Sequence, residues 1–344
     1  MAKKIRPAAV PLVTVDPFFS IWSCADHLHD DCTRHWTEIP APLAIGLLID
    51  GTYWSMGTTE TNFAPCRMKM TQTGLTVSPL TTEYTFENED ARVTLTFTTP
   101  LLLDRLDILC RPASYVAYEI ERKCGNEKEI SFVFGINSRC CVRNQRQMVA
   151  FQKTEYSLCC GNTAQVPLAQ SGDMDVIDWG YLHLCDRNAY VAEAVHERGL
   201  QPLPLNEIYT PFADMPYLTV TYSKPKGVVT LAYDEVYPIE YFGKPLKEFY
   251  TRYFDSFGDM AKATVAEYDQ IKALCDKFDR ELLAEAGRLG EDYQTIVSLA
   301  YRQAIAAHKL VADENGEILF LSKECESNGC IGTLDVTYPS IPLF

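Results

Sequence analysis

The sequence predicts an α+β fold in which an extended N-terminal segment and an antiparallel β-sandwich precede a helical region. Three observations support this prediction: prolines punctuate residues 1–64, apolar and polar residues alternate through residues 65–245, and the hydrophobic period becomes helical in residues 246–344. We therefore predict three domains with these boundaries: a leader packed on the sandwich, the sandwich itself, and a helical region.

The predicted leader is rich in proline. Pro7, Pro11, Pro17, Pro40 and Pro42 interrupt it, and proline removes a backbone donor and clashes with the preceding helical turn. Long helices are therefore excluded here. We expect extended segments that wrap onto another surface.

The middle of the chain has the pattern of β-hairpins. Tyr84 and Phe86 alternate with polar residues, a polar turn follows at 87–90, and the alternation resumes from Val93 to Phe97. Short strands separated by closely spaced turns are typical of an antiparallel sandwich. Two further predicted hairpins join residues 116–120 to 130–136 and residues 218–222 to 229–231.

After Pro245 the pattern predicts helices over residues 246–254, 260–289 and 292–312. The second is densely charged and is expected to be a solvated connector. The third has a broad face of mostly small apolar residues that suits close packing against neighbouring helices: Ile296, Leu299, Ala300, Ala304, Ala307 and Val311. His308, on the same predicted helix, is expected to be a hydrogen-bonded core residue rather than a catalyst.

Composition excludes several classes of partner. The hydrophobic content of 47% is that of a globular protein, and the net charge of −15 disfavours nucleic acid and anionic membrane surfaces. We find no secretory signal and no apolar run long enough to cross a bilayer. The 13 cysteines and the absence of a glycosylation sequon predict a soluble, cytoplasmic protein.

Cofactor and metal motifs are missing from the sequence. It contains no phosphate-binding loop, no dinucleotide fingerprint, no nucleophile elbow and no C-x-x-C. Cys325 and Cys330 lack the further ligands that a structural zinc site needs. Residues 313–316 are expected to form a β-turn rather than a calcium loop. We therefore predict no cofactor and no metal.

Several long segments resemble a known family. Residues 300–304, 306–311, 313–316, 322–324 and 327–340 resemble the glutaminase A type family of bacteria and fungi, and residues 11–23 and 33–37 resemble its leader. This resemblance implies a β-sandwich followed by a six-hairpin (α/α) helical barrel that hydrolyses L-glutamine to L-glutamate and ammonia without a cofactor.

The resemblance also implies that the chain ends where the barrel begins. We accordingly expect the chain alone to be truncated and inactive. Its unfinished helical face is expected to favour self-association.

The candidate catalytic residues are Asp335 and Glu324. Amide hydrolysis needs a carboxylate to deprotonate water, an acid to protonate the leaving ammonia and donors for the oxyanion. Asn328 and Tyr338 are candidate substrate-binding residues in the same segment. By analogy with inverting glycosidases, a second carboxylate is expected beyond residue 344. The alternative is that Glu324 and Asp335 only support turns around nearby glycines.

His35 and Trp36 form a second candidate substrate-binding pair. Tryptophan offers an apolar body with one donor, so the pair can line a polar pocket or anchor the leader onto the sandwich. Where the resemblance leads us to expect glycine after Thr37, this chain has Glu38, and Glu326 stands where we expect an aromatic residue.

Two other functions fit the sequence. A leader plus sandwich can act as a carbohydrate-binding module or one associated with glycoside hydrolases, with a sugar as ligand, although this rests on analogy of fold. A natural truncation product without activity is the third possibility.

Overall fold

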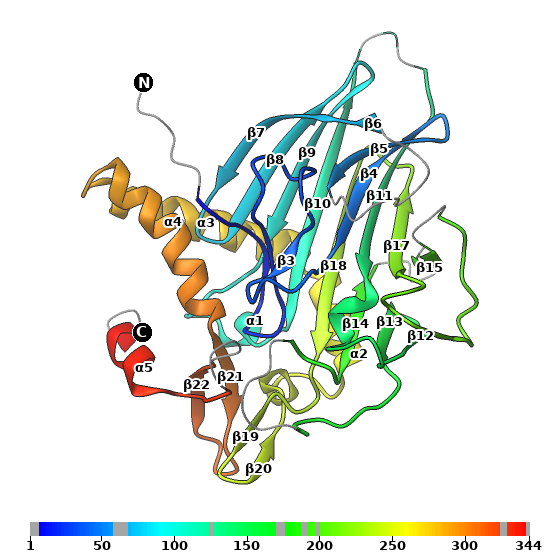
Figure 1. The fold of residues 1–344 in the computed structure, drawn as a ribbon. Helices are drawn as coiled ribbons and strands as arrows, with labels where there is room; N and C mark the ends of the chain where they lie inside the picture. The colour runs from blue at the N-terminus through cyan, green and yellow to red at the C-terminus, as the bar shows by residue number, and fades with distance from the viewer. Residues whose placement is uncertain are drawn as a thin grey trace.

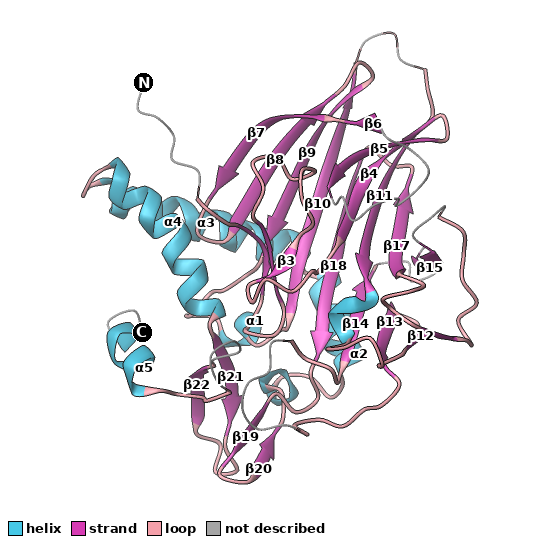
Figure 2. Cartoon of the chain, in the orientation of Figure 1, coloured by secondary structure: helices cyan, strands magenta, loops and turns pink. Residues whose placement is uncertain are grey.

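The computed structural model describes residues 7–57, 68–123, 125, 127–169, 176–186, 192–196, 200–323 and 329–341. Two β-sheets are stacked against each other, and the helices gather around their lower half as Figure 1 orients them. Figure 2 shows how strongly strands dominate the first two thirds of the chain. The predicted α+β fold, a sandwich followed by helices, is confirmed.

The two sheets are named here the large sheet and the small sheet. Within the described residues, neighbouring strands of both pair antiparallel, except β5 and β6, which pair parallel. The large sheet has, in spatial order, β16 (Ile208–Tyr209), β12 (Val149–Lys153), β13 (Ser157–Asn162), β14 (Tyr181–Cys185), β18 (Lys226–Asp234), β10 (Ala113–Arg122), β9 (Ala91–Thr98), β8 (Thr81–Glu87) and β7 (Thr71–Val77). The small sheet has β15 (Ala192–His196), β17 (Pro216–Tyr222), β11 (Ile130–Asn137), β4 (Leu43–Ile49), β5 (Thr52–Gly57) and β6 (Met68–Lys69).

One of the predicted hairpins is confirmed and two are wrong. β8 and β9 pair as expected, and Asn88 Oδ1 accepts hydrogen bonds from the Asp90 and Ala91 amides in the turn between them. In contrast, β10 pairs with β9 and β18, whereas β11 pairs with β4 and β17. The β10–β11 and β17–β18 connections therefore cross between the sheets. Tyr118 and Phe132 stack across the interior with ring centroids 3.9 Å apart.

The leader is part of the core. β1 (Val10–Thr14), β2 (Ser20–Ser23) and β3 (Arg34–His35) form a separate three-stranded sheet that crosses the sandwich. The next two strands of the leader, β4 and β5, belong to the small sheet of the sandwich. Val10, Leu12 and Val13 are fully buried. The leader therefore packs on the sandwich and also supplies strands to it.

The last third of the chain alternates helices with two short hairpins. Its elements are β19 (Ile239–Tyr241), β20 (Lys244–Leu246), the 3₁₀ helix η3 (Phe249–Arg252), α2 (Phe257–Ala266), α3 (Tyr268–Gly287), α4 (Glu291–Ala306), β21 (His308–Ala312), β22 (Ile318–Ser322) and α5 (Leu334–Ser340). Two short helices lie within the sandwich sequence: α1 (Leu106–Leu109) and the 3₁₀ helix η1 (Ser138–Cys141).

Three helix predictions need correction. Residues 246–254 form only the end of β20 and the single turn of η3, and the predicted connector is divided at Glu267 into α2 and α3. The predicted helix 292–312 ends at Ala306, because residues 308–312 pair with β22 as a strand. The β-turn at 313–316 is confirmed: Asp313 Oδ1 accepts from the Asn315 and Glu317 amides.

The α4 helix packs through a different face from the one predicted. Tyr301, Arg302 and Ile305 are buried against the sandwich, whereas Ile296 is 62% exposed. A tyrosine and an arginine thus take the place that small apolar residues were expected to fill.

Arg302 anchors α4 to the sandwich and the leader. Its side chain is fully buried, and its guanidinium donates to the carbonyls of Pro79, Ser78 and Pro11 and to Thr82 Oγ1. Burial lowers the pKa of Arg302 to about 10, so it remains charged at neutral pH. Its rigid fork satisfies acceptors on several segments at once.

We expect Arg302→Lys to lower the free energy of unfolding by about 2 kcal/mol, because one ammonium leaves buried carbonyls without donors. Chemical denaturation followed by circular dichroism measures this loss. Arg288→Lys, in an exposed pair with Glu285, is the matched control and should change stability by less than about 0.5 kcal/mol. Equal effects of the two changes would contradict the anchoring role.

Candidate functional site

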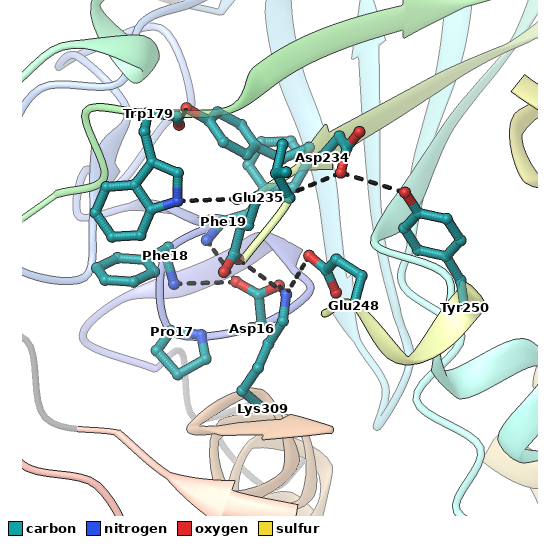
Figure 3. Close-up of polar contacts among 12 residues, drawn as sticks. Asp16, Pro17, Phe18, Phe19, Trp179, Asp234, Glu235, Glu248, Tyr250 and Lys309 are labelled. Carbon is teal, nitrogen blue, oxygen red and sulfur yellow. Dashed lines mark hydrogen bonds and ion pairs between the residues drawn. The ribbon is translucent and has the colours of Figure 1, made fainter. Parts of the chain in front are cut away.

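A buried lysine lies at the junction of the leader, the sandwich and the last hairpin. Figure 3 shows Lys309 pointing from β21 toward Asp16, Glu235 and Glu248. Its ammonium lies 2.7 Å from Asp16 Oδ2, 2.9 Å from Glu235 Oε1 and 3.0 Å from Glu248 Oε1. All four residues are buried. We call them the Lys309 cluster.

Each member of the Lys309 cluster comes from a different segment. Asp16 lies in the turn between β1 and β2, where its Oδ1 accepts from the Phe18 and Phe19 amides. Glu235 follows β18, and Glu248 lies between β20 and η3. Because these segments meet at one ammonium, the cluster joins all of them.

The backbone around Glu235 is held tightly. Its carbonyl accepts from Trp179 Nε1 at 2.9 Å, and the neighbouring Asp234 Oδ1 accepts from Tyr250 Oη at 3.3 Å (Figure 3). Val236 has a φ of 64°, in the left-handed region that a β-branched residue rarely occupies. Such strain is held by surrounding contacts and is common at functional sites.

The carboxyl groups of the cluster are not equivalent. Burial raises the pKa of Glu248 to about 7, with Lys309 opposing and Asp16 adding to the shift. Burial also raises the pKa of Glu235 well above its ordinary value. At Asp16 burial acts in the same direction, but Lys309 and the Phe19 amide outweigh it and lower the pKa. Within the cluster, Asp16 therefore favours its ionised form, whereas Glu235 and Glu248 hold a proton more strongly than ordinary glutamates.

A small cavity borders the cluster. It has a volume of about 20 Å³ and is lined in part by Asp16, Glu248, His308 and Lys309. That volume holds one water molecule and is too small for an amino acid. The cluster can therefore hold charge and protons, but it does not bind an organic substrate within this cavity.

His308 lies on β21 instead of the predicted helix. Its Nδ1 is 2.7 Å from the Ala304 carbonyl, and its ring stacks on Phe320 with centroids 4.9 Å apart. Burial lowers its pKa. The expected role as a hydrogen-bonded core histidine is confirmed.

His35 and Trp36 both bind the turn that carries Asp16. His35 Nε2 donates to the Pro17 carbonyl at 2.9 Å, and Trp36 Nε1 donates to the same oxygen at 2.8 Å. His35 Nδ1 accepts from the Thr37 amide at 3.3 Å. Burial lowers the pKa of His35 to about 4, so the ring is neutral. These contacts anchor the leader, while Trp36 remains 37% exposed.

Glu38 closes the turn that carries this pair. Its φ is 69°, in the left-handed region that favours glycine, and its amide donates to the His35 carbonyl. The glycine expected at this position from the family resemblance thus has a physical reason. Glutamate at this position adopts the same turn, but its backbone is strained.

We expect Glu38→Gly to raise the free energy of unfolding by up to about 1 kcal/mol, because it removes the strain at positive φ. Glu38→Ala is the control, since it removes the charge but keeps the Cβ. The thermal unfolding midpoints of the two variants show whether the gain in stability comes from the backbone or from the carboxylate. An equal gain from alanine would show that the carboxylate, not the backbone, is responsible.

The predicted catalytic segment is partly described. Asp335 lies in the first turn of α5 and is exposed, and Tyr338 is 71% exposed on the same helix. Glu324 and Asn328 lie outside the described residues. Among the described residues, no hydrogen bond or ion pair links Asp335 or Tyr338 to the Lys309 cluster or to His35 and Trp36.

The Lys309 cluster was not predicted from the sequence. The available signal was a set of single charged residues beside apolar runs: Asp16 after Val13-Thr-Val15, Glu235 after the 228–233 strand, and Lys309 before Leu310-Val311. Buried charges are rare unless paired. Nothing in their spacing indicates that these particular residues meet.

Two absences concern the described part of the chain. It contains no group of three or more histidine, cysteine, aspartate or glutamate side chains placed to hold a metal ion. Among its helices, none is both long and apolar enough to cross a membrane.

Family models match most of the chain. Residues 290–344 match the glutaminase A six helical-hairpin domain, residues 80–201 and 205–285 match the domain of unknown function DUF5127, and residues 1–67 match DUF4964. Glutaminase A of Aspergillus oryzae is 31% identical over 112 residues, which cover 31% of this chain and 16% of that protein. A probable glutaminase of Arthroderma benhamiae is 30% identical over 100 residues, 29% of this chain and 12% of that protein.

Proposed function

Because the chain belongs to the glutaminase A type family, we propose that it is the N-terminal portion of an amidohydrolase that converts L-glutamine to L-glutamate and ammonia. The observation that carries the proposal is the match of residues 290–344 to the glutaminase A six helical-hairpin domain. The aligned segments span less than a fifth of the curated relatives, so the activity belongs to the protein that contains the full barrel.

The proposed site lies in the segment after β22. Asp335 and Glu324 are the proposed catalytic carboxylates, and Asn328 and Tyr338 are proposed to bind the substrate. Support comes from the exposure of Asp335 and Tyr338 on α5, where a substrate has access. His35 and Trp36 are proposed as a second substrate-binding pair, and Trp36 is 37% exposed beside the turn that carries Asp16.

The proposal includes a reducing compartment and self-association. Eight of the described cysteines are free thiols, which supports a cytoplasmic location: Cys24, Cys110, Cys140, Cys141, Cys159, Cys160, Cys185 and Cys275. Exposed apolar residues on α4 and α5, among them Ile296 and Leu334, support association through the helical face. No cofactor enters the proposed reaction.

The test is an assay of ammonia release by the protein that carries these residues. We expect release from L-glutamine, with little from L-asparagine, whose side chain is one methylene shorter. Binding of an oligosaccharide without ammonia release would instead support the carbohydrate-binding module, and loss of both would support an inactive truncation product. Either of these results overturns the glutaminase proposal.

A further inference from the structure

We propose that the Lys309 cluster is a proton-dependent positioning site: a proton on Glu248 lets Lys309 hold the β21–β22 hairpin against the sandwich, which fixes the segment that carries Asp335. The link to catalysis rests on the proposed function. The mechanical part, in which a proton holds the hairpin, stands without it.

The hairpin connects the cluster to α5 through a short path. β21 and β22 are paired from His308 and Ser322 at one end to Ala312 and Ile318 at the other. At the end of β22, the Ser322 carbonyl accepts from the Gly332 amide at 2.8 Å, and Ser322 Oγ lies 3.4 Å from Thr337 Oγ1 on α5. A shift of Lys309 therefore moves the base of α5.

The same end of the hairpin also contacts the leader. The Lys323 ammonium lies 4.9 Å from the centre of the Phe18 ring, and the Phe18 ring packs edge-on against Trp179. The Phe18 amide is held by Asp16, the partner of Lys309. The segment after β22 is thus supported at two places, by the contacts of Ser322 with Gly332 and Thr337 and by Lys323 on the Phe18 ring. The Lys309 cluster is connected to both.

The cluster has too little positive charge. One ammonium faces three carboxyl groups, so full ionisation leaves two uncompensated negative charges in a buried site. Glu235 Oε2 is buried, and no N–H or hydroxyl group among the described residues donates to it. Protons are the simplest way to supply the missing charge, because the adjoining cavity of about 20 Å³ holds no more than a water molecule.

The groups around the cluster do not supply that charge. Burial raises the pKa of Tyr233 and Tyr250, and raises that of Cys110 to about 12, so all three remain neutral. Burial lowers the pKa of His308, which is neutral as well. Burial raises the pKa of Asp234, which can only add a proton site or a negative charge.

The direction of the pH dependence follows from Glu248. Its pKa rises from 4.5 to about 7 on folding, so the folded hairpin binds the proton more tightly than the unfolded chain. The stabilisation is fully present below about pH 4.5, decreases as the pH rises toward about 7, and is absent above that pH. Burial also raises the pKa of Asp234 and Glu235, so protons on these carboxyl groups likewise favour the folded state at lower pH.

Other groups contribute at lower pH. Asp16, with a lowered pKa, matters only below its ordinary value of 3.8. The neutral His35 and His308 oppose the trend as the pH falls below their ordinary value of 6.5. Both histidines are present in the wild type and in a Glu248 variant, so the difference between these two proteins isolates Glu248.

Hydrogen exchange of the β21 and β22 amides tests the inference, measured from pH 5 to 8.5 and corrected for base catalysis. Relative to Glu248→Gln, protection in the wild type should fall by up to about tenfold per pH unit between pH 5 and 7 and level off above pH 7. In Glu248→Gln, which mimics the protonated carboxyl, this fall should be absent. Glu240→Gln, an exposed glutamate on β19, should behave as the wild type.

Several outcomes overturn the inference. An unchanged slope in both Glu248→Gln and the second variant, Glu235→Gln, excludes a proton at the cluster. Restoration of protection at pH 8.5 by potassium or ammonium ions would show that a cation, not a proton, fills the site. If protection behaves as expected but no ammonia is released from glutamine at any pH, the proposed function fails and the proton-dependent hairpin stands.

The link to catalysis has its own readout. In the wild type, kcat/KM for glutamine should fall as the pH rises from 5 to 7, in parallel with hairpin protection, and Glu248→Gln should remove that fall. A fall that persists in Glu248→Gln, although its hairpin is protected, would separate the hairpin from the reaction and overturn the positioning role.

Discussion

Replacing Lys309 by methionine should lower the free energy of unfolding by about 3–5 kcal/mol at pH 7, because it leaves three buried carboxyl groups without a cation. Methionine fills a similar volume, so the loss reports charge more than packing. Chemical denaturation at fixed ionic strength measures it.

The loss should shrink at lower pH. Without Lys309, the pKa of each carboxyl in the cluster rises further in the folded state, so the folded variant binds more protons than the unfolded chain and gains stability as pH falls. Adding Glu235→Gln to Lys309→Met should recover part of the loss, because the two sites share one interaction.

Lys244→Met is the matched control. Lys244 forms an exposed ion pair with Glu314, and such pairs contribute less than about 1 kcal/mol. If Lys309→Met costs no more than Lys244→Met, the cluster does not hold the hairpin in place.

Replacing Asp335 by asparagine in the protein that contains the full barrel should reduce kcat for ammonia release by about 10²–10⁴-fold, the usual contribution of a general acid or base. The substitution keeps the size of the side chain, and Asp335 is exposed, so the fold should be unaffected. Steady-state kinetics with glutamine, together with the thermal midpoint, separates a chemical role from a structural one.

Asp292→Asn is the control for this experiment. Asp292 lies in the first turn of α4, as Asp335 lies in the first turn of α5, and both are exposed. Normal activity in Asp335→Asn would return Asp335 to the role of a residue that supports a turn. A fall in the thermal midpoint without loss of kcat would have the same meaning.

Local pattern predicted elements well where the partner strand is adjacent in sequence. Tyr84, Phe86 and Val93 alternate on one face, and the intervening turn is completed by the Asn88 side chain, so β8 and β9 could be paired from sequence alone. The turn at Asp313 was predictable for the same reason, since its hydrogen bonds are made within five residues.

The alternation of apolar and polar residues could not predict which strands pair when they are distant in the sequence. Alternation identifies β10 and β11 as strands, but it does not say that Val116 pairs with Phe97 and Val229 instead of a residue in β11. Residues 308–312 continue the apolar pattern of α4, and only pairing with β22 makes them a strand. Lys309 was missed for the same reason, because its partners lie 61 to 293 residues away.

The distance between Asp16 and Lys309 along the chain also has a consequence for the order of biosynthesis. Asp16 is translated 293 residues before Lys309, its ion-pair partner. Pro11 is translated 291 residues before Arg302, whose guanidinium donates to the Pro11 carbonyl. A chain emerging from the ribosome can begin its sandwich but cannot secure the leader until these two side chains appear. Nascent chains that stall before residue 302 would therefore present an unsecured leader to chaperones and proteases.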